Sequence, residues 1–223
     1  MSILELKDVR FSYSADKNSK EVLKGVNCAF SCGKFYALVG KSGAGKSTLL
    51  SLMAGLDIPT SGQILFEGTP TNKMNLNKYR RKSVSVIYQD FGLFPLLTAL
   101  ENIMYPMQLC KVNPKTAKQE AMALAEKVSL PKELLDRYPT RISGGEQQRV
   151  AIARALTMDR RLILADEPTG NLDSENSDII IELLQKLAHE ENKCVIVVTH
   201  DLSVMDKADE LYRINDGLLE KRN

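Results

Sequence analysis

The chain has 223 residues, of which 43% are hydrophobic and 26% are charged, so it has enough apolar material for a core and is not of the disordered class. A length of 223 residues suits one large domain or two unequal lobes and excludes a mini-protein held together by disulfides. Because 30 Lys and Arg residues nearly balance 28 Asp and Glu residues, leaving a formal charge of +2, we expect no nucleic-acid partner.

The N-terminal segment Met1–Glu5 lacks the basic start and apolar centre of a signal peptide. The longest charge-free stretches, such as 47–56 and 91–100, are far shorter than the roughly 20 apolar residues that cross a membrane as a helix. We therefore expect a soluble cytosolic chain whose four cysteines are reduced core thiols.

Six short segments are predicted as strands. Four are continuous apolar runs rich in branched residues, which is typical of parallel strands covered by helices on both faces. The other two have the pattern of edge strands. The four buried strands are Phe35–Val39, Val84–Tyr88, Leu162–Ala165 and Val195–Val198, and the two edge strands are Ile3–Leu6 and Gly62–Phe66.

The middle of the chain is predicted to be mostly helical. Thr98 and Glu101 form a capping box that opens a helix, which Pro106 should kink. A second helix begins at the cap Asn113-Pro114 and ends near Val128.

Pro131 can open a further short helix, while Ser14–Lys20 and Asn72–Asn77 are polar enough to be surface loops. We expect a helical lobe inserted between the strands of the other lobe. The inserted lobe would span about 90–139 and the other lobe about 1–89 and 140–223.

Each of the four buried strands runs into a polar or glycine-rich sequence. In open α/β sheets, ligands bind beyond the carboxyl ends of the strands, so these strand ends predict a single site. The residues that follow the strands are Gly40, Gln89, Asp166-Glu167 and Thr199-His200.

A phosphate-binding loop follows the first buried strand. It fits the pattern G-x-x-x-x-G-K-[ST] and runs into the apolar helix Leu49–Ala54. Backbone N–H groups and the helix N-terminus bind phosphate oxygens, Lys46 adds a positive charge, and Ser47 supplies a hydroxyl for Mg²⁺. We therefore predict nucleotide binding by Gly40, Lys41, Ser42, Gly43, Ala44, Gly45, Lys46, Ser47 and Thr48.

Two adjacent carboxylates end the third buried strand. Because successive strand residues point to opposite faces, we expect Asp166 and Glu167 to have different roles. Asp166 would hold Mg²⁺ beside Ser47, and Glu167 would orient or deprotonate an attacking water. His200, at the end of the next strand, is a candidate partner of the γ-phosphate; the alternatives are a solvated acidic turn and a structural histidine.

The segment Ser143-Gly144-Gly145-Glu146 precedes an Ala-rich sequence typical of a packed helix. Ser143 and Glu146 fit a capping box, and this could be their whole role. Two exposed glycines at a capped helix N-terminus also form a second anion site, which a single mononucleotide pocket does not need.

Together these segments resemble the ATP-binding subunit of ABC transporters over nearly the whole chain. Residues 142–150 resemble the family signature, with Ile142 in place of the usual Leu. Gln89 matches the Q-loop, 171–173 the D-loop and His200 the switch histidine. The resemblance implies an α/β fold of the P-loop NTPase type over 1–223, with a mostly parallel core sheet, an N-terminal antiparallel β subdomain and an inserted helical subdomain.

The resemblance also implies that ATP and Mg²⁺ bind at a head-to-tail homodimer interface, where Ser143, Gly144, Gly145 and Glu146 of one subunit close over ATP on the phosphate loop of the other. Tyr13 would stack on adenine. Ser47, Gln89 and Asp166 would bind the metal, and Glu167 and His200 would be catalytic.

The segments 86–102 and 166–174 are most similar to the branch of lipoprotein-release, macrolide and antimicrobial-peptide exporters, with the cell-division ATPase close by. A separate integral-membrane permease would dock near Asp90 to Cys110 and hold the ATPase at the cytoplasmic face of the membrane. The apolar residues of that segment could equally be interior. An ATPase that regulates a membrane-anchored cell-division or cell-wall partner remains an open alternative.

Other ATPase and GTPase classes fit less well. DNA-repair and chromosome ATPases separate the phosphate loop from the signature by long coiled-coil arms, and no sustained heptads lie between 48 and 143. A GTPase would carry N-K-x-D, which 72–75 and 77–80 both fail to match. A small-molecule kinase would not explain 143–149, and tandem-cassette translation factors carry each motif twice.

Overall fold

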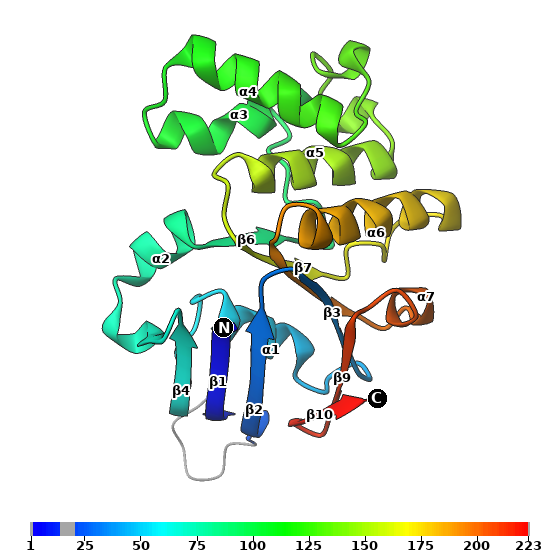
Figure 1. Ribbon diagram of the computed structural model, residues 1–223. Helices are drawn as coiled ribbons and strands as arrows, with labels where there is room; N and C mark the ends of the chain where they lie inside the picture. The colour runs from blue at the N-terminus through cyan, green and yellow to red at the C-terminus, as the bar shows by residue number, and fades with distance from the viewer. Residues whose placement is uncertain (1, 14–20, 223) are drawn as a thin grey trace.

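A computed structural model of the chain describes residues 2–13 and 21–222, and at positions 202 and 203 only the backbone (Figure 1). Over these residues the chain forms two sheets and a set of helices above the larger sheet. The predicted loop Ser14–Lys20 lies outside the described residues.

The larger sheet has the order β10-β9-β3-β8-β7-β6. The five neighbouring strands from β9 to β6 run parallel, and only β10 pairs antiparallel, so the expected mostly parallel core sheet is confirmed. Its strands are β3 (Lys34–Val39), β6 (Val84–Ile87), β7 (Leu162–Asp166), β8 (Cys194–Thr199), β9 (Glu210–Asn215) and β10 (Leu218–Arg222).

The smaller sheet is antiparallel and has the order β2-β1-β4-β5. Its strands are β1 (Ser2–Phe11), β2 (Leu23–Ser31), β4 (Ser61–Phe66) and β5 (Thr69–Pro70). The expectation that Ile3–Leu6 and Gly62–Phe66 are edge strands is wrong, because β1 pairs with both β2 and β4, and β4 pairs with both β1 and β5. The short strand β5 and the longer β2 take the edges instead.

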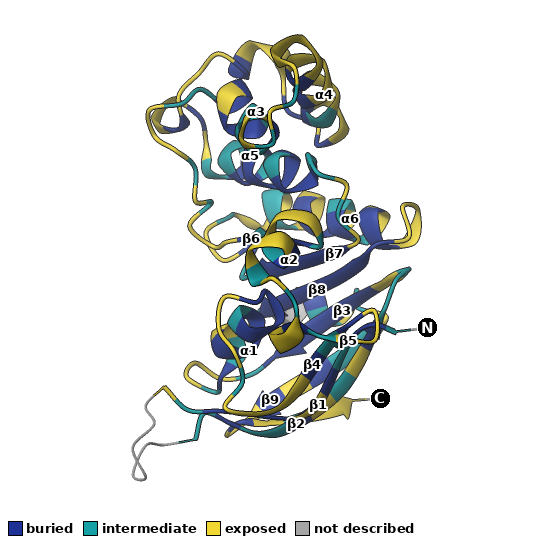
Figure 2. Cartoon of the chain, turned by 90° about the vertical axis from the view of Figure 1, so that its left-hand side faces the viewer, coloured by how far each residue is buried: buried dark blue, intermediate teal, exposed yellow. Residues whose placement is uncertain are grey.

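The strands β3, β7 and β8 of the large sheet are almost wholly buried (Figure 2). Their side chains alternate between two cores, one on each face of the sheet. Phe35 and Ala37 of β3 join a core shared with the helices, whereas Tyr36 and Leu38 join a core shared with the small sheet and α1 (Lys46–Met53). This alternation follows from the two-residue period of a strand and explains why such strands are continuous apolar runs.

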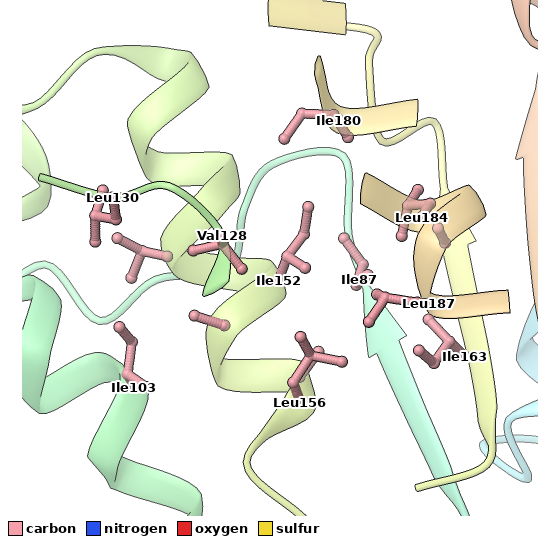
Figure 3. Close-up of a cluster of buried hydrophobic side chains, with 14 of the residues drawn as sticks. Ile87, Ile103, Val128, Leu130, Ile152, Leu156, Ile163, Ile180, Leu184 and Leu187 are labelled. Atoms are coloured by element: carbon pink, nitrogen blue, oxygen red, sulfur yellow. The ribbon is translucent and has the colours of Figure 1, made fainter. Parts of the chain in front are cut away.

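The helices above the large sheet pack on one another and on the sheet. Figure 3 shows Ile103, Val128 and Ile152 in one continuous cluster with Ile87 and Ile163 of the sheet. The helices are α3 (Ala99–Leu109), α4 (Pro114–Lys127), α5 (Gly144–Leu156) and α6 (Ser174–His189), with the short α7 (Leu202–Met205) after β8.

The predicted caps are confirmed. Thr98 and Glu101 form a complete capping box at α3, and Asn113 accepts a hydrogen bond from Lys115 N at the start of α4. α3 continues through Pro106, and a short 3₁₀ helix at Lys132–Leu134 follows Pro131.

The prediction of a surface loop at Asn72–Asn77 is wrong. A 3₁₀ helix covers Thr71–Lys73, and Asn75 caps α2 (Leu76–Lys82), whose polar sequence hides its helical character because Tyr79 is its only buried residue. All four cysteines are free. Cys194 is buried in the core, and the half-buried Cys28 and Cys32 pack against it, so the expectation of core thiols fails only at Cys110. No helix among the described residues is long and apolar enough to span a bilayer.

Candidate nucleotide site

A cavity of about 700 Å³ opens at the carboxyl ends of β3, β6, β7 and β8, as the polar strand ends predict. Ala44 belongs to the phosphate loop but does not line this cavity, and Ser143–Glu146 lie at the start of α5, outside it. The predicted site residues that line it are Tyr13, Gly40, Lys41, Ser42, Gly43, Gly45, Lys46, Ser47, Thr48, Gln89, Asp166, Glu167 and His200.

The phosphate loop joins β3 to α1, and two of its glycines are sterically required. A Cβ on Gly40 would run into the carbonyl oxygen of Ile214, and Gly45, which caps α1, has a φ of 106°. The side chain of Lys46 folds back over the loop, where Nζ donates to the carbonyls of Gly40 at 2.8 Å and Lys41 at 3.2 Å. The ammonium group therefore lies within the curve of the loop, where phosphate groups would be bound.

Asp166 is the last residue of β7 and lines the cavity together with Ser47. Burial raises the pKa of Asp166, and hydrogen bonding from Ser47 and the charge of nearby Lys46 oppose the rise. The residues Ser47, Gln89 and Asp166 thus offer a hydroxyl, an amide and one carboxylate beside the phosphate loop. Mg²⁺ is commonly bound by one or two carboxylates together with substrate phosphates, so this donor set suits it. No group of three or more His, Cys, Asp or Glu side chains among the described residues could hold a metal ion alone.

Glu167 leaves the strand in a left-handed conformation with a φ of 45°. Its Oε1 lies 2.9 Å from His200 Nδ1, and its Oε2 accepts from Thr199 Oγ1 at 3.1 Å and from the His200 backbone N–H at 3.3 Å. Its side chain is only 13% exposed, whereas that of His200 is 71% exposed. Asp166 and Glu167 therefore have different partners.

Gln89 and Tyr13 lie at the margins of the cavity. The Gln89 carbonyl accepts from Asn171 Nδ2 at 3.2 Å, which joins the loop after β6 to the loop after β7. The ring of Tyr13 is exposed and packs edge-on against Phe11, while its hydroxyl lies 2.7 Å from Thr48 Oγ1.

The segment Ser143–Glu146 forms the first turn of α5. Glu146 N donates to Ser143 Oγ, and Ser143 N donates to the Glu146 carboxylate at 2.6 Å, so the predicted capping box is confirmed. Sequence reasoning misses Asn176, whose side chain packs on this turn at Gly145. Its position three residues after the helix cap Asp173 is the signal that could have pointed to it.

The arrangement of a phosphate loop, two strand-end carboxylates and a separate capped glycine turn matches known proteins. The family model of the ABC transporter matches residues 23–170. The chain belongs to the ABC transporter family. It is an ATP-binding cassette subunit that hydrolyses ATP.

Two curated relatives cover almost the whole chain. The lipoprotein-releasing system ATP-binding protein LolD of Saccharophagus degradans is 42% identical over 99% of this chain and 97% of its own length. The macrolide export ATP-binding/permease protein MacB of Syntrophobacter fumaroxidans is 41% identical over 99% of this chain but only 31% of its own length. A dimeric structure of the cassette MJ0796 in a post-hydrolysis state with ADP and Pi has a TM-score of 0.88 at 37% identity, covering 99% of each chain. The expected branch is therefore confirmed.

Proposed function

We propose that two copies of this chain bind ATP and Mg²⁺ between them in a head-to-tail dimer. The observation that carries this proposal is the position of Ser143–Glu146, a capped helix N-terminus with two glycines that does not line the cavity of its own chain. A second copy could bring this turn over ATP held by the phosphate loop. Two structures of the similar cassette MJ0796 are dimeric, one of them bound to ADP and Pi, which supports assembly as a dimer.

In the proposed mechanism, backbone N–H groups of the phosphate loop and Lys46 hold the phosphates, and the exposed ring of Tyr13 stacks on adenine. Ser47, Gln89 and Asp166 would hold Mg²⁺, which would supply positive charge against the phosphates. Glu167 accepts a proton from the attacking water. His200 keeps the Glu167 carboxylate in place through Nδ1 and contacts the γ-phosphate.

The same proposal includes a membrane permease that docks near Asp90 to Cys110. This segment contains both buried and exposed apolar residues, so its buried residues are interior, and we propose docking for the exposed ones. Ile103 and Met107 are buried, whereas Phe94, Leu96 and Leu109 are 42%, 86% and 60% exposed. These three residues are exposed apolar side chains on the chain that follows Gln89, and such exposed apolar positions suit a partner that responds to the nucleotide site.

We further propose that the subunit acts at the cytoplasmic face of the membrane and drives export or extraction of a peptide, lipoprotein or drug-like cargo. The names of the LolD and MacB relatives support transport over the alternative, regulation of a cell-division or cell-wall partner. Isolating the complex from membranes and identifying the co-purifying proteins separates the two: a permease supports transport, and a cell-wall hydrolase supports regulation.

The shared site is tested by mixing two inactive variants. Lys46→Ala removes the phosphate-loop charge, and Ser143→Arg blocks the signature turn. A heterodimer of the two has one site with both defects and one intact site, so the mixture should recover ATPase activity that neither variant has alone. A chain carrying both changes is the control and should stay inactive. No recovery, and no ATP-dependent association in any mixture with the membrane complex supplied, would contradict the dimer.

A further inference from the structure

Thr199 is the last residue of β8, and its hydroxyl contacts the carboxylate of Glu167. Thr199 Oγ1 lies 3.1 Å from Glu167 Oε2 and accepts a hydrogen bond from the Asp201 backbone N–H at 3.0 Å. An ionised carboxylate can only accept, and a hydroxyl has one proton to donate. The Thr199 hydroxyl therefore donates its proton to the Glu167 carboxylate and accepts a hydrogen bond from the Asp201 backbone N–H.

The position of Thr199 is fixed by the centre of the sheet. β8 lies between β3 and β7, and Thr199 pairs with Val39, the residue before the phosphate loop. Its neighbour Val198 pairs with Asp166 and accepts a hydrogen bond from Glu167 N at 2.8 Å. Thr199 is fully buried and β-branched, so its side chain has little rotational freedom. Its hydroxyl is a rigid donor aimed at Glu167.

Glu167 needs such support because its own backbone has left the regular strand. Its φ of 45° is uncommon for a residue with a side chain. Of the groups that hold its carboxylate, the His200 ring is largely exposed, and the His200 backbone N–H is farther from Oε2, at 3.3 Å, than the Thr199 hydroxyl. The buried hydroxyl is thus the most constrained contact of the carboxylate.

We propose that Thr199 is a positioning residue for ATP hydrolysis, whose hydroxyl holds one oxygen of Glu167 and thereby aims the carboxylate at the attacking water. This inference rests on the proposed role of Glu167 as the base. Small displacements of a catalytic group lower the turnover rate far more than substrate affinity. Removing the Thr199 hydroxyl should therefore lower kcat and leave the affinity for ATP, which the phosphate loop provides, nearly unchanged.

The test compares Thr199→Val, which keeps the shape and removes the hydroxyl, with Thr199→Ser, which keeps the hydroxyl. We expect kcat to fall at least about tenfold in Thr199→Val with the KM for ATP changed less than about threefold, and Thr199→Ser to recover most of the rate. Like Glu167→Gln, Thr199→Val should also prolong the ATP-bound dimer in size-exclusion chromatography.

Ser85→Ala is the matched control. Ser85 is a buried residue of β6 whose hydroxyl donates to the Ala155 carbonyl at 2.6 Å, away from Glu167. Its loss should lower the melting temperature without changing kcat. If Thr199→Val does not fold, Thr199→Ala makes the same comparison.

The inference is overturned if Thr199→Val hydrolyses ATP at the wild-type rate, or if Thr199→Ser loses as much activity as Thr199→Val. A rise in KM with unchanged kcat would also overturn it, because the hydroxyl would then serve binding. These outcomes differ from failure of the proposed role of Glu167, which would appear as normal hydrolysis by Glu167→Gln.

Discussion

Gly145 in α5 faces the side chain of Asn176 in α6 so closely that a Cβ at position 145 would lie 2.5 Å from Asn176 Oδ1. Asn176 is held in place, because Oδ1 accepts from Arg149 Nη2 at 3.1 Å and Nδ2 donates to the Asp173 carboxylate at 2.9 Å. The first turns of the two helices are therefore in direct contact, and glycine at 145 is required by packing.

Gly145→Ala should destabilise the protein by about 1–3 kcal/mol, because the added methyl overpacks this contact. Gly144→Ala is the control, since a Cβ there would meet its nearest neighbour, the Asn171 carbonyl, at 3.6 Å. Alanine is a better helix former than glycine, so Gly144→Ala should be neutral or stabilising. Chemical denaturation of both variants measures the difference; equal stabilities would refute the packing requirement.

Asp166→Asn should raise the melting temperature of the nucleotide-free protein at neutral pH while abolishing Mg²⁺-dependent ATP hydrolysis. Burial raises the pKa of Asp166 in the folded state. At pH values above the ordinary pKa of an aspartate, the ionised carboxylate therefore lowers the stability of the wild-type protein. At pH values below that pKa, Asp166 is protonated in both the folded and the unfolded state, and the difference in melting temperature between the wild type and Asp166→Asn should vanish. Thermal melts of both proteins from neutral to acidic pH measure this difference. A melting temperature of Asp166→Asn below that of the wild type at pH 7 would contradict the prediction.

Glu167→Gln should bind ATP normally and lose about 10²- to 10⁴-fold in kcat, because the amide cannot accept the proton of the attacking water. The uncleaved nucleotide should then keep the dimer together in size-exclusion chromatography with ATP. Turnover within a few-fold of wild type would remove Glu167 from the mechanism.

Leu96→Glu should prevent co-purification with the permease and leave the ATPase rate of the isolated subunit unchanged, because Leu96 is 86% exposed in the proposed docking segment. Met122→Glu is the control, since Met122 is an exposed apolar residue of α4 outside that segment. Equal permease recovery with both variants would place the docking surface elsewhere.

The sequence predicts those parts of the fold whose pattern is contained in one short segment of the chain. The apolar runs of β3, β7 and β8 identify the large sheet because each strand is buried on both faces. β2 is not predicted from the sequence. Its pairing with β1 has register shifts, and these break the simple alternation of apolar and polar residues. α2 was missed for a different reason, since Tyr79 is its single buried residue.

In the nucleotide site, the phosphate loop and the strand-end residues could be predicted, because each depends on short spacings and on the common end of parallel strands. Contacts between distant segments could not. Arg154 in α5, for example, donates to the carbonyls of Phe91 and Gly92, two consecutive residues with positive φ in the chain after Gln89. Nothing in the spacing of these residues indicates that they meet.

The apolar cluster that runs without a break from Ile163 in the sheet through Ile152 to Ile103 limits how this protein can be engineered (Figure 3). Grafting residues 90–139 from a relative to alter permease choice would replace Ile103 but keep Ile152 and the sheet. Such chimeras should fold only when the donor segment matches the recipient in side-chain volume at this junction. Under the proposed docking at Asp90 to Cys110, we therefore expect permease choice to change more readily when exposed positions such as Leu96 are exchanged than when the whole segment is exchanged.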